Sequence, residues 1–139
     1  MKTFIVRCSY FEIYNDYVYD LLAALEHLDT PMHVCEDSKR KDFYVKGLKE
    51  YMVNNLEECL EILKIGETNR HYAATSMNHQ SSRSHSIFRL SVQSITRDEE
   101  ESLKEEFSEE NSSEVSDRVI TEAILNFVDL AGSEKVSNH

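Results

Sequence analysis

The stretch VITEAILNFVDLAGSE, residues 119–134, decides the fold. Residues 123–128 within it are mostly apolar, as a buried central strand requires, and the run ends in Asp129. In an open α/β sheet, ligands collect where strands end, so a carboxylate at this point is placed to meet a metal ion or its water shell. By itself, an apolar run followed by D-x-x-G is a weak signal.

A second segment, NHQSSRSH at residues 78–85, gathers small hydroxyls and amides around one guanidinium. Serine oxygens are hard ligands of the kind that magnesium takes, and Asn and Ser also bond phosphate oxygens. Arg83 offers a planar fork for a carboxylate or a phosphate. Alone, this segment reads as a polar loop with a phosphorylation-like serine cluster. The two segments together are far more specific than either one.

The first part of the chain predicts a strand, a turn and a short helix. Thr3–Tyr14 is rich in β-branched and aromatic residues, so we expect a strand with both faces buried. Asn15-Asp16 is a turn signal. Leucines at helical spacing predict a short helix over Tyr17–Leu28, which Asp29-Thr30-Pro31 ends.

Two short strands and a longer helix are expected next. Met32–Cys35 and Phe43–Leu48 are the strand candidates. Apolar residues at i, i+3, i+4 and i+7 predict the helix, namely Leu56, Cys59, Leu60 and Leu63. Asn55 with Glu58 is typical of a capping box at its start. We expect Gly66 in or near its last turns.

The last part predicts a loop and two strands. Thr75–Ser84 has the composition of a loop, His85–Ile95 alternates as a half-exposed strand does, and Val119–Val128 is a second strand. The acidic insertion, residues 97–118, lies between them, and residues 98–118 alone supply −8 of the formal net charge of −11. We interpret this run as a solvated insertion at a hairpin tip and assign it no chemistry.

Composition indicates one globular domain, because the chain has 139 residues of which 40% are hydrophobic. Outside the acidic run, positive and negative charges nearly balance. The composition therefore indicates no basic surface of the kind that binds nucleic acid or an anionic membrane. No apolar run approaches the roughly 18 residues of a membrane span, and the start is not a signal peptide. We therefore expect a soluble intracellular protein that binds neither nucleic acid nor membrane.

The cysteines and histidines indicate no metal or disulfide framework. Cys8, Cys35 and Cys59 are odd in number, far apart and in no C-x-x-C pair, so a reducing cytosol is the default. The histidines lack metal-site spacing, and Ser84-His85 has no third partner for a Ser-His hydrolase.

Residues 78–90 (NHQSSRSHSIFRL) and 126–136 (NFVDLAGSEKV) resemble the two switch segments of the kinesin motor domain, with switch I over 78–85 and switch II over 129–134. Further landmarks follow in family order: SYFEIYN at 9–15, DLL at 20–22, YVKGL at 44–48 and NRH at 69–71. The resemblance covers essentially the whole chain outside the acidic run. It implies an α/β fold, part of the P-loop NTPase kinesin motor fold, with one side of a mixed central sheet and flanking helices.

The resemblance implies that the complete motor domain binds ATP and Mg²⁺. Ser82 would be the direct magnesium ligand, and Asp129 would hold the ion through water. Asn78 and Ser81 would approach the γ-phosphate and the attacking water.

The resemblance also implies a latch between the switches. The Gly132 backbone N–H would sense the γ-phosphate, while Arg83 and Glu134 would form the bridge that closes the two segments around ATP. Lys39-Arg40-Lys41 and Lys46 lie where the family has a loop that faces tubulin, which is acidic; a solvated loop is the alternative.

The phosphate-cradling loop G-x-x-x-x-G-K-[ST] does not occur in these residues. We expect that loop before Met1 and the main microtubule-contacting helix after His139, so residues 1–139 would be a partial motor domain. The strand Val119–Asp129 would then have an open edge, and the isolated chain should be marginally stable or insoluble.

The function expected from the resemblance is part of a microtubule-based motor that couples ATP binding and hydrolysis to movement, inactive as an ATPase on its own. The alternatives are a non-catalytic kinesin-like interaction module and an unrelated polypeptide with switch-like loops. Cytoplasm and cytoskeleton are the expected location. Arg70-His71-Tyr72 and residues 86–90 lean towards the centromere-associated mitotic kinesins, which would add the mitotic spindle.

Overall fold

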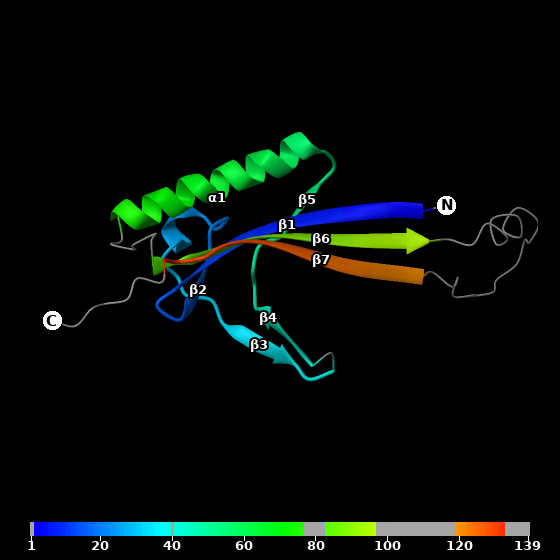
Figure 1. Cartoon of the computed structure of the whole chain (residues 1–139), viewed down its shortest axis with the longest axis horizontal. Helices are drawn as coiled ribbons and strands as arrows, with labels where there is room; N and C mark the ends of the chain where they lie inside the picture. The colour runs from blue at the N-terminus through cyan, green and yellow to red at the C-terminus, as the bar shows by residue number, and fades with distance from the viewer. Residues whose placement is uncertain (1, 40, 77–82, 97–118, 133–139) are drawn as a thin grey trace, which may run out of the picture.

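The computed structural model describes residues 2–39, 41–76, 83–96 and 119–132. A five-stranded sheet forms its centre, with helix α1 along one face and a small separate hairpin, β3–β4, on the other side (Figure 1). In chain order the elements are β1 Lys2–Tyr14, β2 Tyr17–Asp20, the 3-10 helix η1 Leu25–His27, β3 Val34–Asp37, β4 Asp42–Val45, β5 Tyr51–Val53, α1 Leu56–Ser76, β6 His85–Thr96 and β7 Val119–Asp129. Within these residues, no helix combines the length and the apolar composition that a membrane crossing requires.

The sheet has the order β2-β1-β6-β7, and β5 pairs with residues Val6–Cys8 of β1. Each pairing among the described strands is antiparallel. The α/β character agrees with the sequence prediction, whereas the parallel pairs of a mixed sheet stay a prediction.

Strand β1 carries the core because its side chains alternate between two covered faces. Cys8 and Tyr10 point to the α1 side, where Phe88 of β6 joins them. Phe11 packs on the other side with Val18 and residues that follow β2 and β4. The prediction of two buried faces is confirmed for the middle of β1, but Lys2–Phe4 is exposed because only β6 pairs with it there.

The helix predicted over Tyr17–Leu28 is wrong. Asn15 and Asp16 both adopt positive φ, at 50° and 66°, which makes the two-residue turn that returns the chain along β1. Residues 17–20 therefore form strand β2, and only Leu25–His27 is helical. The Asp20 carboxylate accepts hydrogen bonds from the backbone N–H groups of Leu22 and Lys49, at 2.8 and 3.0 Å, and burial raises its pKa.

Helix α1 begins as predicted, at an Asn55–Glu58 capping box. The Glu58 N–H donates to Asn55 Oδ1 at 2.9 Å, and Asn55 Nδ2 donates to Glu58 Oε1 at 3.1 Å. The inward stripe is shifted from the predicted one, because Cys59, Ile62 and Leu63 pack on the core. The predicted stripe members Leu56 and Leu60 are 67% and 52% exposed.

Gly66 lies in the middle of α1 and not in its last turns, because the helix continues to Ser76. A Cβ at this position would stand 2.0 Å from the Tyr10 ring. Glycine here lets the helix approach β1 closely, which explains why a residue that weakens helices occurs in the middle of one.

The short strands differ in detail from prediction. β3 and β4 are displaced by two residues and one residue from their expected starts, and β5 was not predicted because three residues are too few to show alternation. β6 and β7 have the predicted extents within one residue and pair as a hairpin from Ser86↔Asp129 to Thr96↔Val119.

Strand β7 is exposed along its whole length, so its predicted burial is wrong for the described residues. It lies at one edge of the sheet and pairs there with β6. Within the described part of the chain no helix covers either of its faces, as the exposed fractions of its side chains show. Among the described strands β7 pairs only with β6, which agrees with the open edge that the sequence predicted.

Candidate functional site

The two segments singled out in the sequence meet at one end of the β6–β7 hairpin. Because the strands are antiparallel, the start of β6 lies beside the end of β7, and Ser86 pairs with Asp129. The last residues of 78–85 and the first residues of 129–134 are therefore neighbours. Helix α1 ends at the same side of the molecule (Figure 1).

Arg70, from the last turns of α1, connects these elements. Its Nη1 donates to Asp129 Oδ2 at 3.2 Å, and its Nη2 donates to the Ser84 hydroxyl at 3.4 Å. Its Nε lies 3.9 Å from Glu12 Oε2 on β1. One guanidinium thus contacts β1, the residue before β6 and the end of β7.

Burial differs sharply across this cluster. The side chains of Glu12 and Arg70 are 3% and 12% exposed, whereas that of Asp129 is 74% exposed. The buried Glu12–Arg70 pair fixes the position of the guanidinium, because separating buried charges costs several kcal/mol. The pair with Asp129 is solvated and contributes only about 0–1 kcal/mol to stability. Its geometry leaves the Asp129 carboxylate accessible to water and ligands.

His85 makes a second link between the segments. The Ala131 backbone N–H donates to His85 Nδ1 at 3.0 Å. Nδ1 is the acceptor in this bond, which corresponds to the imidazole tautomer that carries its proton on Nε2. It orients the backbone directly before Gly132.

Tyr10 and Glu67 fasten α1 to β1 one turn before Arg70. The Tyr10 hydroxyl donates to a carboxylate oxygen of Glu67. Burial, followed by this hydrogen bond, raises the pKa of Tyr10 to about 12. The Tyr10 ring also meets Phe88 edge-on with 5.5 Å between centroids. The helix end that carries Arg70 is therefore attached to β1 by two contacts, Tyr10 with Glu67 and Glu12 with Arg70.

A hollow of about 220 Å³ opens beside Asp129 on the α1 side of the sheet. Its lining is largely apolar and includes Tyr10, Leu63, Phe88 and Phe127, with Ser86 and Asp129 as the polar members at the β7 end. The hollow places open space next to the carboxylate that the sequence analysis assigned to magnesium.

The other predicted site residues divide into two groups. Arg83 and Gly132 are described and exposed, next to the ends of β6 and β7. Four lie outside the described residues: Asn78, Ser81, Ser82 and Glu134. The predicted Arg83–Glu134 bridge and the roles of the switch I side chains therefore stay predictions.

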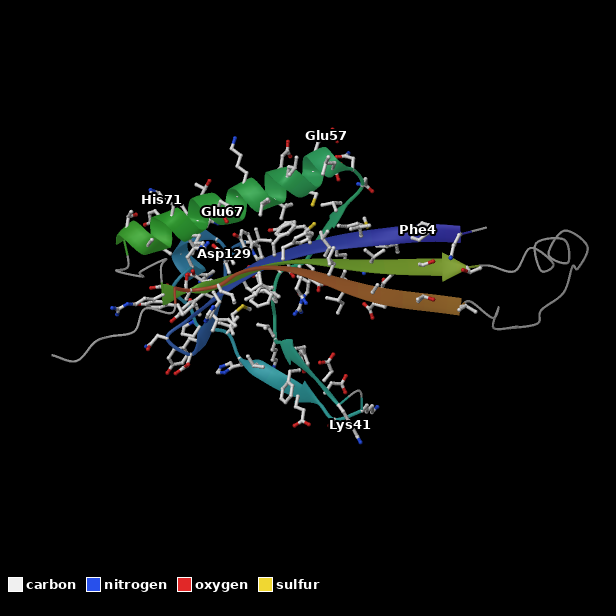
Figure 2. The ribbon with its side chains drawn as sticks, viewed as in Figure 1. Phe4, Lys41, Glu57, Glu67, His71 and Asp129 are labelled. Atoms are coloured by element: carbon white, nitrogen blue, oxygen red, sulfur yellow. The ribbon has the colours of Figure 1, made fainter. Side chains whose placement is uncertain are left out.

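The basic residues assigned to tubulin contact lie on the β3–β4 hairpin. Lys39 and Lys41 lie in its turn and Lys46 directly follows β4, all exposed, while Arg40 is outside the described residues. Figure 2 shows Lys41 at the hairpin tip, well away from Asp129. The hairpin presents its charges separately from the α1–β6–β7 cluster.

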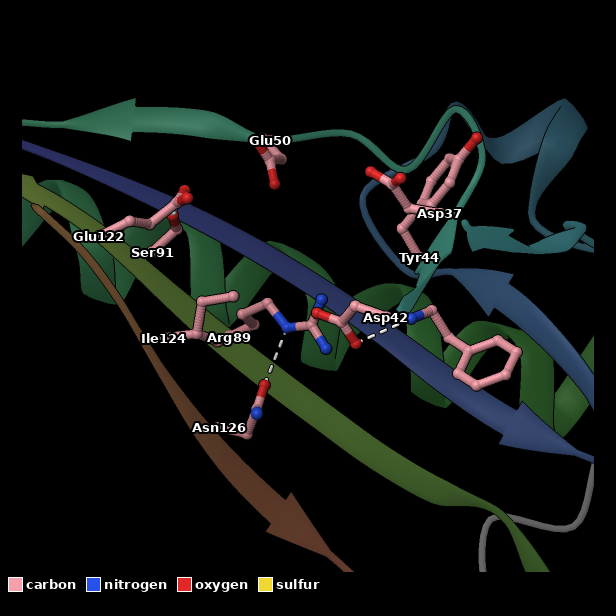
Figure 3. A pocket seen from close by; sticks show the side chains of 10 residues that line it. Asp37, Asp42, Tyr44, Glu50, Arg89, Ser91, Glu122, Ile124 and Asn126 are labelled. Atoms are coloured by element: carbon pink, nitrogen blue, oxygen red, sulfur yellow. Dashed lines mark hydrogen bonds between the residues drawn. The ribbon is translucent and has the colours of Figure 1, made fainter. Parts of the chain in front are cut away.

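A larger hollow, of about 460 Å³, lies between this hairpin and the other face of the sheet (Figure 3). Carboxylates of Asp37, Asp42 and Glu122 face it. Its guanidinium, Arg89, donates through Nε to Asn126 Oδ1 at 2.8 Å and stacks 5.4 Å from the Phe11 ring centre. None of the predicted switch residues lines it.

Sequence reasoning missed the roles of Arg70, Glu12 and His85. Arg70 was noted only as a family landmark. A buried arginine on a helix needs a buried acid as its partner, and this requirement was not used. Glu12 gave the matching signal, a carboxylate inside an otherwise apolar strand, which is rare unless the charge is paired. No sequence signal points to the His85–Ala131 bond, because it depends on how the two strand ends meet.

Comparisons with known proteins agree over the whole chain. A family model described as the kinesin motor domain matches residues 1–139. The chain is 40% identical over 136 residues to kinesin-like protein KIN-7L of Oryza sativa subsp. japonica, covering 98% of this chain and 18% of that protein. It is 40% identical over 134 residues to kinesin heavy chain isoform 5A of Homo sapiens, covering 96% of this chain and 11% of that protein.

A solved structure of a fast kinesin superposes with a TM-score of 0.74 at 36% identity, covering 98% of this chain and 32% of that one. The chain thus spans less than a fifth of the curated relatives named above and about a third of the solved structure. The centromere-associated subgroup stays a prediction. With a family model matched from its first residue to its last and relatives at 40% identity, the chain belongs to the kinesin motor domain family.

Proposed function

We propose that this chain is the switch-bearing part of a microtubule-based motor that couples ATP binding and hydrolysis to movement along microtubules. One observation carries the proposal. Arg70 bonds both Asp129 and Ser84, so α1, the end of segment 78–85 and the start of segment 129–134 form one connected unit. A change at either segment therefore reaches the helix.

The donor set fits magnesium and nucleotide phosphate. Carboxylate and serine oxygens are the hard ligands that Mg²⁺ prefers, and the ion keeps several waters. Asp129 is largely exposed with Arg70 on one oxygen, which suits a carboxylate that holds the ion through water. Ser82 is proposed as the direct ligand. When bound, ATP with Mg²⁺ supplies the transferable phosphoryl group and neutralises its charge.

The remaining switch residues are assigned to positioning. We assign Asn78 and Ser81 to the γ-phosphate and the attacking water, and the Gly132 N–H to sensing the γ-phosphate. Arg83 and Glu134 are assigned to the latch that closes the two segments. Loss of the γ-phosphate would release contacts that hold both segments, which is how order–disorder switches couple chemistry to motion.

The rest of the motor is assigned to parts outside this sequence. Residues 1–139 contain no G-x-x-x-x-G-K-[ST] loop, so the phosphate-cradling backbone is expected from another part of the protein. The hairpin bases Lys39, Arg40, Lys41 and Lys46 are proposed to face acidic tubulin. The proposed location is the microtubule cytoskeleton, with the mitotic spindle as a finer possibility to test.

The test compares Asp129→Asn with Glu122→Gln, a matched loss of charge at the opposite end of the same strand, in the natural protein that carries this chain. We expect Asp129→Asn to lower microtubule-stimulated ATP turnover by about 10²-fold or more, because phosphoryl transfer depends on electrostatic positioning. Glu122→Gln should leave turnover within about twofold.

Equal turnover in both variants would overturn the assignment of Asp129. A natural protein that binds microtubules but hydrolyses no ATP would instead support the non-catalytic interaction module. Arg70→Lys sharpens the result: a lysine keeps the charge but cannot bond Ser84 and Asp129 together, so turnover should fall while folding persists.

A further inference from the structure

Two free thiols face each other between the sheet and the helix. Cys8 lies in the middle of β1 and Cys59 in the first turns of α1, 51 residues apart in the chain, and their sulfur atoms are 3.7 Å apart. Cys35 is also free but belongs to β3, in the separate hairpin. A close pair of thiols on two different elements is a defined place for covalent chemistry.

We propose that Cys8 and Cys59 form an oxidation site at which a peroxide converts the two thiols into a disulfide that ties α1 to β1. The site is independent of the proposed motor function, because neither cysteine contacts the Arg70 cluster. The spacing of the three cysteines along the chain gives no sign of this pair. The fold brings two of them together.

The geometry fits this bond. The Cys8 thiol already points at Cys59 Sγ as a hydrogen-bond donor, and the sulfurs need to close from 3.7 Å to about 2.05 Å. Both side chains belong to the same apolar cluster, beside Tyr10 and Leu63. A small movement of the helix turn that carries Cys59 would bring the two sulfur atoms to bonding distance, and the path of the backbone would not need to change.

The order of the two chemical steps follows from burial. Cys8 is 0% exposed, and burial together with the hydrogen bond to Cys59 raises its pKa to about 12, so it stays a thiol that peroxide does not reach. Cys59 is only half-buried. Its sulfur attacks the peroxide, the O–O bond breaks, and a sulfenic acid and one water form.

Cys8 then resolves the sulfenic acid. Its sulfur attacks Cys59 Sγ, the S–O bond breaks, and the hydroxide leaves with the Cys8 proton as a second water. Overall, two thiols lose two electrons and two protons, and one peroxide becomes two waters. The high pKa of Cys8 makes this second step the slow one.

The disulfide would fix the beginning of α1 against β1. Arg70 lies eleven residues further along the same helix, about 16 Å at the helical rise. Oxidation would therefore restrain sliding of α1 over the sheet, and a thiol reductant would release it. The expected signature is slower backbone hydrogen exchange over residues 56–66 in the oxidised protein.

The test treats the natural protein that carries this chain, purified under reduction, with a limited amount of hydrogen peroxide. Peptide mapping without reduction should recover residue Cys8 joined to Cys59. A protease that cuts after glutamate is needed, because Glu12 and Glu26 separate Cys8 from Cys35, whereas trypsin leaves both in one peptide. The cross-linked peptide should disappear after treatment with a thiol reductant.

Cys35→Ser is the matched control and should keep the cross-link, while Cys59→Ser should abolish it. Cys59 is the better variant because it is only half-buried, whereas replacing fully buried Cys8 endangers folding. The proposal is overturned by a cross-link that contains Cys35, by a cross-link that forms only in urea, or by sulfinic acid on Cys59 with Cys8 still free.

Discussion

Strands β1 and β7 are both long and rich in apolar residues, yet their surroundings are opposite. In β1, residues Cys8–Glu12 are all buried, between α1 on one face and residues following β2 and β4 on the other. In β7 every residue is exposed. Both strands pair with β6, so hydrogen bonding along one edge is not what separates them.

The difference teaches that apolar sequence marks a strand for burial, while its neighbours decide whether burial occurs. β1 has strands on both edges and a helix whose Gly66 permits close approach. Among the described residues, β7 pairs only with β6 and is exposed on both faces. Asp129 therefore lies at the end of the less protected of the two strands.

The largest effect on stability is expected at one pair of facing residues in β6 and β7. Phe88 of β6 and Phe127 of β7 are opposite each other, 6.5 Å between ring centres, but are 7% and 53% exposed. Phe88→Ala should lower the free energy of unfolding by about 3–5 kcal/mol. Phe127→Ala should lower it by about 1 kcal/mol, mainly through the lost ring pair. Urea unfolding of the two variants measures this, and equal losses would contradict the contrast.

A second prediction tests the close approach of α1 to β1. Gly66→Ala places a methyl group against the Tyr10 ring and should cost about 2 kcal/mol, after the gain in helix propensity is included. In a Tyr10→Ala background the same change should be nearly neutral or stabilising. Thermal unfolding of the four proteins gives the coupling between the two residues. A coupling near zero would show that the helix can move away without cost.

A third prediction uses pH to compare a core tyrosine with a surface one. Folding raises the pKa of Tyr10 from 10.0 to about 12, so the folded state holds the proton more tightly. The stabilisation that the protonated Tyr10 hydroxyl contributes is therefore fully present below pH 10. It is lost as the pH rises from 10 towards 12, by about 1 kcal/mol per pH unit. In urea unfolding between pH 10 and 11, Tyr10→Phe should reduce the slope of stability against pH by about this amount, while Cys8, whose pKa burial also raises to about 12, keeps contributing in the same range. Tyr17→Phe, at a 53% exposed position, should keep the full slope.

The smallest effect on stability is expected at the β7 edge, where the effect on solubility should be clear. Leu125→Lys introduces a charge on an exposed strand and should change the free energy of unfolding by less than about 0.5 kcal/mol. It should also suppress light scattering by the isolated chain, because charged edge strands resist pairing with other chains. Leu60→Lys on α1, at a similarly exposed position, is the control and should not change the scattering.

The sequence predicted those elements whose local pattern agrees with their packing. The capping box, the start of α1 and the strands β1, β6 and β7 are confirmed. Residues 17–20 were misread because leucine spacing was weighed above the Asn15-Asp16 turn, and pairing with β1 decides their structure. The burial of β7 was misread because a pattern cannot state which neighbours are present.

The site was predictable in part for the same reason. Asp129 was identified from its place after an apolar strand, and the hairpin does set it beside the start of β6. Arg70 and His85 could not be assigned, since their bonds to Asp129 and Ala131 span 59 and 46 residues. Contacts of that range depend on the register of the whole hairpin, which no local pattern encodes.

The β6–β7 hairpin has a further practical consequence. One end of the hairpin is the pair Ser86↔Asp129, and the opposite end is the pair Thr96↔Val119, ten residue steps or about 33 Å away. Residues 97–118 join the strands at that distant end. A fluorophore, epitope or spacer attached beside Thr96 or Val119 would therefore sit far from the contact between Asp129 and Arg70.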